Sequence, residues 1–335
     1  MRVLVIGGAG YIGSHTCLEL AAQGHFPIIY DNLSTGFREL IGPFPFVEGD
    51  IFEQEKLRVA LAAVDAVMHF AASAYVGESV ENPRKYFRNN VEGSLSLLDA
   101  VIASSVRIFI FSSTCNTYGA TNAGMLDESL PQLPVNPYAS SKLFIEHALR
   151  AYRRSAGLKA ICLRYFNAAG ADPEARTGEM HSPETHLIPL ALQAAMGIGA
   201  NLTVFGGNFP TPDGTCIRDY VHVTDLAKAH VSAMDYVHRG GTEFALNLGT
   251  GRGHSVLEVV EMIRQVTGCD VPYSIGMQRE GDPAKLVANP SLANRELGWQ
   301  AQFGLEDIIR SSWAWIQLKH QASKGIKVAR NMSGK

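Results

Sequence analysis

The sequence predicts an α/β protein built on a doubly wound parallel sheet, with a smaller mixed α/β domain beside it. Short apolar, β-branched runs alternate with helical patterns through the first half of the 335-residue chain. Strands that are apolar almost throughout indicate a parallel sheet covered on both faces. A glycine-rich turn follows the first of these runs, as in the Rossmann fold.

The predicted elements come in regular order. Six strands are expected at 2–7, 27–30, 45–49, 66–72, 107–113 and 159–166. Helical patterns lie between them at 11–23, 53–62, 83–104 and 138–155. Right-handed crossovers bring the carboxyl ends of such strands to one edge of the sheet, where ligands bind.

After about residue 166 glycine, proline and threonine cluster and the elements become shorter. We therefore expect a first domain over 1–166 and a second over 167–318, with some segments of the second returning to the first. Residues 319–335 carry basic side chains and no acid, which predicts a flexible, solvated tail.

Composition excludes several classes of function. A net charge of −3 gives no sign of a nucleic-acid partner. The five cysteines are widely spaced and form no CxxC pair, so we expect no disulfide framework and a reducing cytoplasm. The eleven histidines show no HExxH spacing, and we expect no metal. No apolar run approaches the ~18–20 residues that a membrane span needs, and the N-terminus does not resemble a signal peptide.

The stretch "IGGAGYIGSH" predicts a dinucleotide site. Gly8, Gly10 and Gly13 satisfy G-x-G-x-x-G between a strand and a helix, where the backbone can approach a pyrophosphate. Asp31 ends the second predicted strand, and a carboxylate there accepts hydrogen bonds from ribose hydroxyls and repels a 2′-phosphate. NAD is therefore predicted rather than NADP. Asp50 could lie over the adenine or could simply cap a helix.

A proton-transfer group is predicted at the same edge of the sheet. Thr114 ends the fifth strand in "FSSTCNTYG", and "NPYASSK" opens the next helix with Pro137 at its start and Asn136 as a possible cap. Tyr138 and Lys142 lie one turn apart on that helix. A tyrosine has a pKa near ~10, and a nearby cation can lower it by ~1–3 units. We expect Lys142 and a positive nicotinamide to make Tyr138 a base.

These motifs resemble the extended short-chain dehydrogenase/reductases. The likeness continues through "HFAASAYVGESVENP", "LRYFNAAGA", "GTCIRDYVHVTDLA" and "REGDPA", and over roughly 1–315 it is similar to the UDP-glucose 4-epimerase (UDP-galactose 4-epimerase) family. The resemblance implies interconversion of UDP-glucose and UDP-galactose. Tightly bound NAD oxidises the sugar at C4, the 4-keto sugar rotates, and hydride returns to its other face. It implies Tyr138 as base, Lys142 on the nicotinamide ribose, and Thr114 on the sugar oxygen.

The resemblance also implies two sets of binding residues. The family touches NAD at the positions of Gly7, Gly10, Tyr11, Ile12, Gly13, Asp31, Asn32, Leu33, Ser34, Thr35, Gly36, Asp50, Ile51, Phe70, Ala71, Ala72, Asn89, Thr114, Tyr138, Lys142 and Phe166. It holds the UDP-sugar at the positions of Thr114, Tyr138, Asn167, His186, Leu187, Phe205, Arg218, Tyr220, Arg279 and Asp282. Arginine suits a diphosphate, although without the family each arginine would be read as a surface ion-pair residue.

The chain departs from the family pattern at several positions. Ala74 stands where some members have lysine, and His186 where some have asparagine. Leu286 stands where members have either a large aromatic or a small residue, so acceptance of N-acetylated sugars stays open. Helices matching 83–104 and 138–155 pair across a dimer interface in the family, which implies a homodimer.

Related functions differ at identifiable positions. A nucleotide-sugar 4,6-dehydratase typically has an Asp-Glu pair directly after the threonine, whereas this chain has Cys115 and Asn116. A decarboxylase or uronate epimerase needs a cationic group for the sugar carboxylate, and none is evident in 72–80 or 114–118. Epimerases of UDP-GlcNAc/UDP-GalNAc or UDP-pentoses share the same groups. A non-catalytic NAD-binding sensor would be free to lose the tyrosine or lysine, and this chain keeps both.

Overall fold

A seven-stranded parallel sheet forms the centre of the molecule. The computed structural model describes residues 1–121, 124–279 and 282–332, with side chains described to residue 322. In this part of the chain the strand order is β10-β6-β5-β4-β1-β2-β3. All neighbours are parallel, which confirms the predicted fold class. The strands are β1 (Arg2–Ile6), β2 (Phe26–Asp31), β3 (Phe46–Glu48), β4 (Ala66–His69), β5 (Ile108–Thr114), β6 (Lys159–Tyr165) and β10 (Ala245–Leu248).

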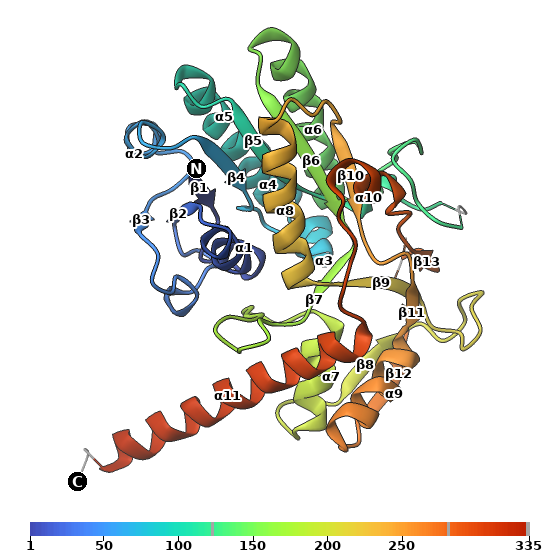
Figure 1. Ribbon diagram of the computed structural model, residues 1–335. Coiled ribbons are helices and arrows are strands. Elements are labelled where there is room, and N and C mark those ends of the chain that lie inside the picture. Colours follow the sequence, from blue (N-terminus) through green and yellow to red (C-terminus); the bar gives the residue numbers. More distant parts are fainter. Residues whose placement is uncertain (122–123, 280–281, 333–335) are drawn as a thin grey trace.

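Helices cover both faces of this sheet (Figure 1). Helices α1 (Tyr11–Ala22) and α8 (Val223–His238) pack on one face, and α2 (Gln54–Leu61), α5 (Gly93–Ala103) and α6 (Pro137–Ser155) on the other. Successive strand side chains alternate between the faces. In β1, Val3 and Val5 join the α1–α8 core, whereas Leu4 and Ile6 join the opposite core. Burial on both faces explains why the strands are apolar throughout.

The helix predicted over 83–104 is divided into three pieces. They are α4 (Pro83–Tyr86), a π-helical segment Phe87–Glu92, and α5, and α3 (Val76–Glu81) precedes them. The buried Asn90 amide accepts from the Ser73 backbone N–H at 2.8 Å and donates to its carbonyl at 3.0 Å. This long-range contact lies beside the π-helical turn, a distortion that often marks functional sites.

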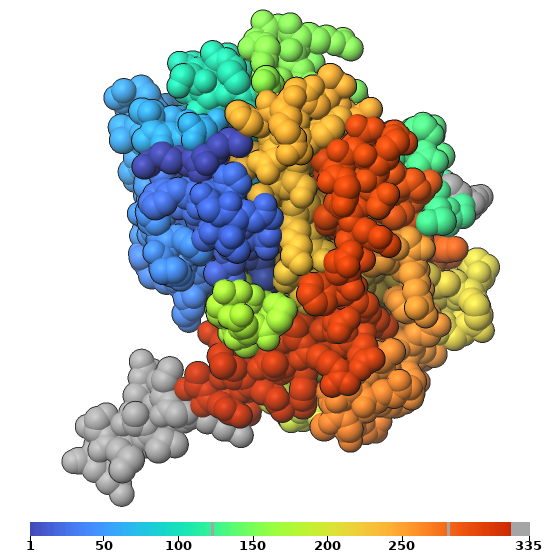
Figure 2. All heavy atoms as spheres, viewed as in Figure 1, coloured from blue at the N-terminus to red at the C-terminus, as the bar shows by residue number. Residues whose placement is uncertain are grey.

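The second half of the chain adds two small sheets and a separate apolar core. Strand β10 nevertheless pairs with β6 in the main sheet. Figure 2 shows α8 (gold) beside the segment that contains α10 (red), and the two helices are in contact. The elements are β7 (Asn167–Ala169), β8 (Leu202–Phe205), β9 (Ile217–His222), β11 (Gly253–Ser255), β12 (Tyr273–Gly276), β13 (Lys285–Leu286), α7 (Leu187–Ala195), α9 (Val256–Thr267), α10 (Ser291–Leu297) and α11 (Leu305–Met332).

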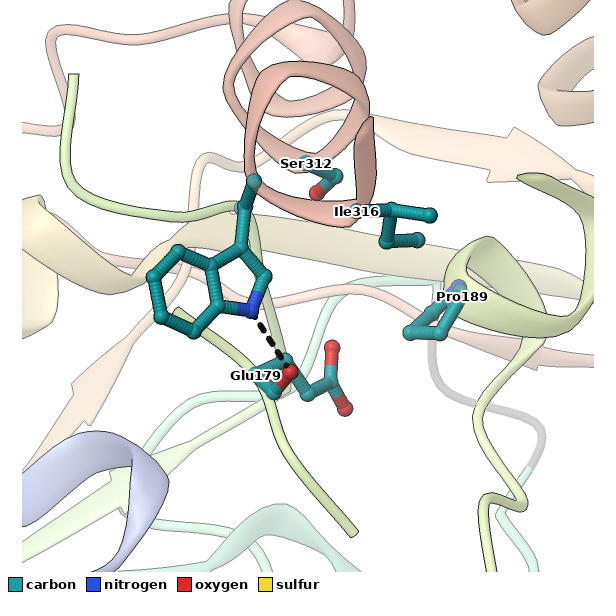
Figure 3. A pocket seen from close by; sticks show the side chains of 6 residues that line it. Glu179, Pro189, Ser312 and Ile316 are labelled. Carbon is teal, nitrogen blue, oxygen red and sulfur yellow. Dashed lines mark hydrogen bonds between the residues drawn. The ribbon is translucent and has the colours of Figure 1, made fainter. Parts of the chain in front are cut away.

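The segment expected to be a tail from residue 319 begins within a long helix, and its flexibility stays a prediction. Helix α11 continues to Met332, and residues 333–335 lie outside the described part. Trp315 anchors this helix, because its indole is buried and its Nε1–H donates to the Glu179 carbonyl at 3.0 Å (Figure 3). The residues that follow are mostly strong helix formers, so the helix propagates beyond its anchor. Among the described residues, no helix combines the length and apolarity needed to cross a membrane.

Candidate active site

The predicted site residues gather at the carboxyl edge of the main sheet. Gly7 directly follows β1, Asp31 ends β2, Phe70 follows β4, Thr114 ends β5 and Phe166 follows β6. Strand β1 lies between β2 and β4, so the chain order reverses beside it. Open parallel sheets bind ligands in the crevice at such a reversal.

The glycine loop leaves no room for side chains. A Cβ at Gly13 would lie 2.3 Å from the Gly7 carbonyl oxygen, and one at Gly7 would lie 2.5 Å from the Ala71 nitrogen. Gly7 also has a φ of +81°, which favours glycine. Helix α1 begins directly after Gly10, and its first N–H groups face the loop. A cradle of this kind, closed to any Cβ, fits the pyrophosphate of a dinucleotide.

Asp31 is held rigidly beside this loop. Its carboxylate accepts from the backbone N–H of Ala9 at 3.0 Å and of Leu33 at 2.8 Å, and only 8% of the residue is exposed. Burial raises the pKa of Asp31 above its usual value, against these two hydrogen bonds. A carboxylate has about four lone-pair sites, so acceptor capacity remains for two ribose hydroxyls. The geometry fits NAD.

A second acid lies nearby. Asn32 donates to the Asp50 carboxylate at 2.7 Å, and the same carboxylate accepts from the Phe52 N–H at 3.0 Å. Asp50 thus closes a local turn at Phe52 and does not cap α2, whose N-cap is Glu53, so the helix-cap reading is wrong and the adenine contact stays a prediction. The other predicted cofactor residues follow β2, β3 and β4 at this edge, except Tyr11 and Ile12 at the start of α1 and Asn89 in the π-helical segment.

Helix α6 delivers the predicted base. It begins at Pro137, and the Asn136 side chain accepts from the Ala139 N–H at 2.9 Å, which confirms the predicted start and cap. The buried Lys142 ammonium donates to the Ser112 carbonyl at 2.8 Å. The Thr114 hydroxyl lies close enough to the Tyr138 phenol to lower the pKa of the phenol in part. Strand β5 and helix α6 therefore bring the hydroxyl of Thr114, the phenol of Tyr138 and the amine of Lys142 to the carboxyl end of β5.

Asn116 is a residue of this site that the sequence analysis did not single out. Its backbone N–H and its side-chain amide both donate to the Thr114 Oγ1, each at 3.2 Å. With its lone pairs engaged, the Thr114 hydroxyl is left to donate its own hydrogen. The only signal in the sequence was its position two residues after the threonine, where dehydratases typically have a carboxylate.

The side chains around Tyr138 do not lower its pKa by themselves, and the lowering expected beside Lys142 and a bound nicotinamide stays a prediction. Burial raises the pKa of Tyr138 to about 12, and the Thr114 hydroxyl only partly opposes this. Burial also lowers the pKa of Lys142 to about 7, since the residue is only 4% exposed. Desolvation acts against both charged forms. The side chains alone therefore favour a neutral phenol, and a lowered pKa requires positive charge from elsewhere.

The predicted sugar-nucleotide residues fall into neighbouring groups. A pocket is lined in part by Asn167 and Tyr220, which pair across β7 and β9, and by His186 and Leu187 at the start of α7. The remaining residues form two pairs. Arg218 and Asp282 are in direct ion-pair contact, and the guanidinium carbon of Arg279 lies 3.9 Å from the ring centroid of Phe205.

A buried ion pair joins helix α6, which carries the predicted base, to strand β6. Arg164 on β6 donates through Nε to Glu146 on α6 at 2.9 Å, and Ser113 on β5 donates to the same carboxylate at 2.6 Å. Both charged side chains are at most 2% exposed. The contacts fix α6 against the two strands whose ends carry the site. A charged residue inside the apolar run "KAICLRYF" was the signal for it.

Known proteins resemble this chain over nearly its whole length. The model of the NAD dependent epimerase/dehydratase family matches residues 3–249. A UDP-glucose 4-epimerase of Rhizobium meliloti is 50% identical over 96% of this chain and 98% of its own length. Two solved structures share the fold. UDP-glucose 4-epimerase from Brucella ovis in complex with NAD is 51% identical, with a TM-score of 0.91 over 93% of this chain and 97% of that one. The enzyme from Stenotrophomonas maltophila, with bound NAD and formylated UDP-arabinopyranose, is 40% identical, with a TM-score of 0.93 over 96% and 99%. The chain therefore belongs to the NAD dependent epimerase/dehydratase family and, within it, to the UDP-glucose 4-epimerases.

Proposed function

We propose that this chain interconverts UDP-glucose and UDP-galactose through a 4-keto sugar, with Tyr138 as the base. The observation that carries the proposal is the meeting of Thr114, Tyr138 and Lys142 at the carboxyl end of β5, beside the glycine cradle. When bound, NAD would accept the hydride from sugar C4 and give it back.

The chain's own residues move and hold one proton in this proposal. Tyr138 takes the proton of the sugar 4-hydroxyl and later returns it. Thr114, already aligned by Asn116, donates a hydrogen bond to the same sugar oxygen and keeps it in register with the phenol. Lys142 binds the nicotinamide ribose and supplies positive charge to the phenol when protonated.

The proposed cofactor residues are those assigned by resemblance, with Asp31 on the adenine ribose and Gly7, Gly10 and Gly13 under the pyrophosphate. The proposed diphosphate contacts come from Arg218 and Arg279. The close stack of Arg279 on Phe205 supports a site for a flat uracil ring beside a phosphate.

Non-stereospecific return of hydride needs a pocket that accepts both faces of the keto sugar. The pocket beside Asn167, His186 and Tyr220 is the proposed site of that rotation. Leu286 is 4% exposed and packs in one cluster with Cys115 and Phe166. Turnover of UDP-glucose, UDP-galactose and their N-acetyl counterparts, side by side, tests how much room this leucine leaves.

The test of the whole proposal uses UDP-galactose and the purified protein with no added NAD, with UDP-glucose as the measured product. Conversion supports an epimerase that retains its cofactor. Bound NAD without any turnover would favour the alternative, a non-catalytic NAD-binding sensor. Release of water from the sugar would favour a dehydratase instead, against the Cys115–Asn116 sequence after Thr114.

The working form is proposed to be a cytoplasmic homodimer, with NAD handled by residues 1–166 and the UDP-sugar by residues 167–318. The exposed aromatic side chains of Phe87 (42%) and Phe144 (58%) lie on the two segments that would pair between subunits. The free cysteines among the described residues fit a reducing compartment.

A further inference from the structure

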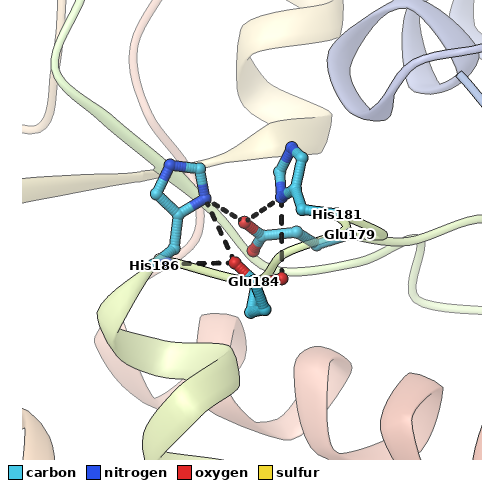
Figure 4. A group of neighbouring side chains, drawn as sticks. All are labelled: Glu179, His181, Glu184 and His186. Atoms are coloured by element: carbon cyan, nitrogen blue, oxygen red, sulfur yellow. Dashed lines mark hydrogen bonds and ion pairs between the residues drawn. The ribbon is translucent and has the colours of Figure 1, made fainter. Parts of the chain in front are cut away.

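Four potential metal ligands meet beside the proposed sugar pocket. The donor atoms of Glu179, His181, Glu184 and His186 all lie within 4.8 Å of one another (Figure 4). The four residues come from one short segment before α7, with the spacing E-x-H-x-x-E-x-H. The expectation of no metal rested on the missing HExxH spacing, which describes ligands on a helix. Here a loop brings the side chains together.

Two of the donor separations match those around a tetrahedral ion, and the others would adjust as an ion binds. Zn²⁺ bonds of ~2.0–2.2 Å place neighbouring donors of a tetrahedron about 3.3–3.6 Å apart. The Nδ1 of His181 lies 3.3 Å from Glu179 Oε1 and 3.6 Å from Glu184 Oε2. The Nδ1 of His186 lies 3.8 Å from Glu184 Oε1. Glu179 and His186 are in direct hydrogen-bonded contact and would separate as an ion enters.

Three of the four side chains are largely shielded from solvent, whereas the side chain of His186 is 47% exposed. The side chains of Glu179, Glu184 and His181 are 6%, 11% and 20% exposed. Within the described chain, the His181 Nδ1 is shielded from solvent and lacks a hydrogen-bond partner of good geometry, although both carboxylates face it. One divalent ion balances two carboxylates when both imidazoles are neutral.

The carboxylate of Glu184 is also oriented in advance. It accepts from the backbone N–H of Thr185 at 2.8 Å and of His186 at 2.9 Å. Hydrogen bonds of this kind fix ligand orientation around metal ions. The segment is held from outside as well, because the Tyr75 hydroxyl donates to the Pro183 carbonyl at 3.0 Å.

We propose that Glu179, His181, Glu184 and His186 form a closed four-coordinate site for a divalent transition-metal ion of the Zn²⁺ class. Four protein ligands make the site structural, since a catalytic zinc keeps an open position. Imidazole nitrogens with carboxylate oxygens suit zinc better than calcium or magnesium, which take oxygen ligands alone. The proposed epimerase reaction needs no such ion, so the two proposals stand or fall separately.

The ion would act on the pocket wall. Glu179, His186 and Leu187 all line the pocket that also contains Asn167 and Tyr220. A bound ion ties the loop that carries Glu179 to the first residues of α7. We expect it to stabilise the folded protein and to hold His186 in one orientation at the pocket.

The test is metal binding by the full-length protein after dialysis against a chelator, with Zn²⁺ and Co²⁺ as probes. We expect elemental analysis to find one ion per chain. The Co²⁺-loaded protein should show the intense visible absorption of tetrahedral Co²⁺, and Zn²⁺ should raise the melting temperature. The ring centroid of His181 lies 6.1 Å from that of Tyr11 and 6.1 Å from that of Tyr75, so His181→Phe keeps an aromatic ring at this position. His181→Phe and Glu184→Gln should each lose the absorption and the thermal shift. Their affinity should fall by more than the roughly 10–100-fold typical of an outer contact.

His254→Gln is the matched control, because His254 faces a single carboxylate, Glu258, at 3.9 Å. It should bind Co²⁺ like the parental protein. The proposal is wrong if the parental protein takes up no stoichiometric metal or if its Co²⁺ spectrum is octahedral. It is also wrong if His181→Phe and Glu184→Gln, folded by circular dichroism, match His254→Gln in spectrum and stoichiometry. Should one variant fail to fold, the other and the parental spectrum still decide.

Discussion

Replacing Tyr138 by phenylalanine removes one oxygen from the proposed active site and keeps the ring. The edge-on contact with Tyr86, with ring centroids 6.5 Å apart, remains available, so the variant should fold. A positioned base contributes about 10²–10⁴ in rate, equivalent to about 2.7–5.4 kcal/mol of activation energy. We expect kcat for UDP-galactose to fall by roughly that factor while the bound NAD content stays unchanged.

The expected loss of rate depends on how readily the Tyr138 phenol ionises. The pKa of Tyr138 is raised to about 12, so ionising it at pH 8 costs about 5.4 kcal/mol. That cost is as large as the whole benefit of a base. A nearby cation lowers a pKa by about 1–3 units, and Lys142 with a pKa of about 7 carries little charge at pH 8, so the positive nicotinamide is needed. Tyr138 should therefore titrate at lower pH with NAD than without it.

The assay combines initial rates of UDP-glucose formation from pH 6 to 10 with ultraviolet difference titration of the tyrosines. Tyr152→Phe is the control, because Tyr152 lies on the same helix and its hydroxyl only reaches Asp99, at 3.4 Å. In the parental protein and in Tyr152→Phe, the rate should rise with pH over part of this range. In Tyr138→Phe this rise should be absent. Parental turnover by Tyr138→Phe, or a Tyr138 titration that NAD leaves unmoved, would refute the reasoning.

Four other perturbations test the surrounding structure. Gly13→Ala places a Cβ 2.3 Å from a backbone carbonyl oxygen, so the purified variant should lose bound NAD, measured by nucleotide released on denaturation. Lys142 binds its proton more weakly when folded, with a pKa of about 7. Stability should therefore rise with pH from about 7 to about 10.4, by at most about 1.4 kcal/mol per pH unit, and urea midpoints of Lys142→Met should lack that slope. Glu146→Gln leaves Arg164 buried without a full partner and should cost about 3–5 kcal/mol of unfolding free energy, whereas replacing both by methionine should cost less. Phe144→Glu should yield monomers in sedimentation, and an unchanged mass would contradict the proposed dimer face.

The sequence carried the fold well because local pattern and tertiary structure agree in the first half. Residues such as Val3 and Leu4 are buried on opposite faces of β1, so the strand is apolar throughout and easily recognised. Asn136 and Pro137 likewise start α6 by purely local chemistry. The break in the helix over 83–104 was not predictable in this way. It lies beside the contact of Asn90 with the Ser73 backbone, which no local pattern records.

The candidate site, too, could be predicted only in part from the sequence. The positions of Thr114, Tyr138 and Lys142 could be read from motif and strand order. Their supports could not, because Asn116 acts through hydrogen-bond geometry and Glu146 through a partner on another element. The metal-ligand cluster was missed for a related reason. Its spacing around His181 and His186 means little until a loop turns the four side chains toward one point.

The pKa values of Tyr138 and Lys142, the proposed catalytic pair, depend on burial, which the sequence does not show. Counting charges places a cation beside Tyr138 and predicts an acidic phenol. Burial of both groups instead favours neutral phenol and partly neutral amine, with pKa values of about 12 and about 7. Under the proposed function, Tyr138 then becomes a base only next to an oxidised, positively charged nicotinamide. Once hydride has left the sugar that charge is gone, and Tyr138 regains its affinity for the proton it has taken. The desolvated pair thereby ties proton transfer to hydride transfer, and Tyr138 keeps the proton until the hydride returns.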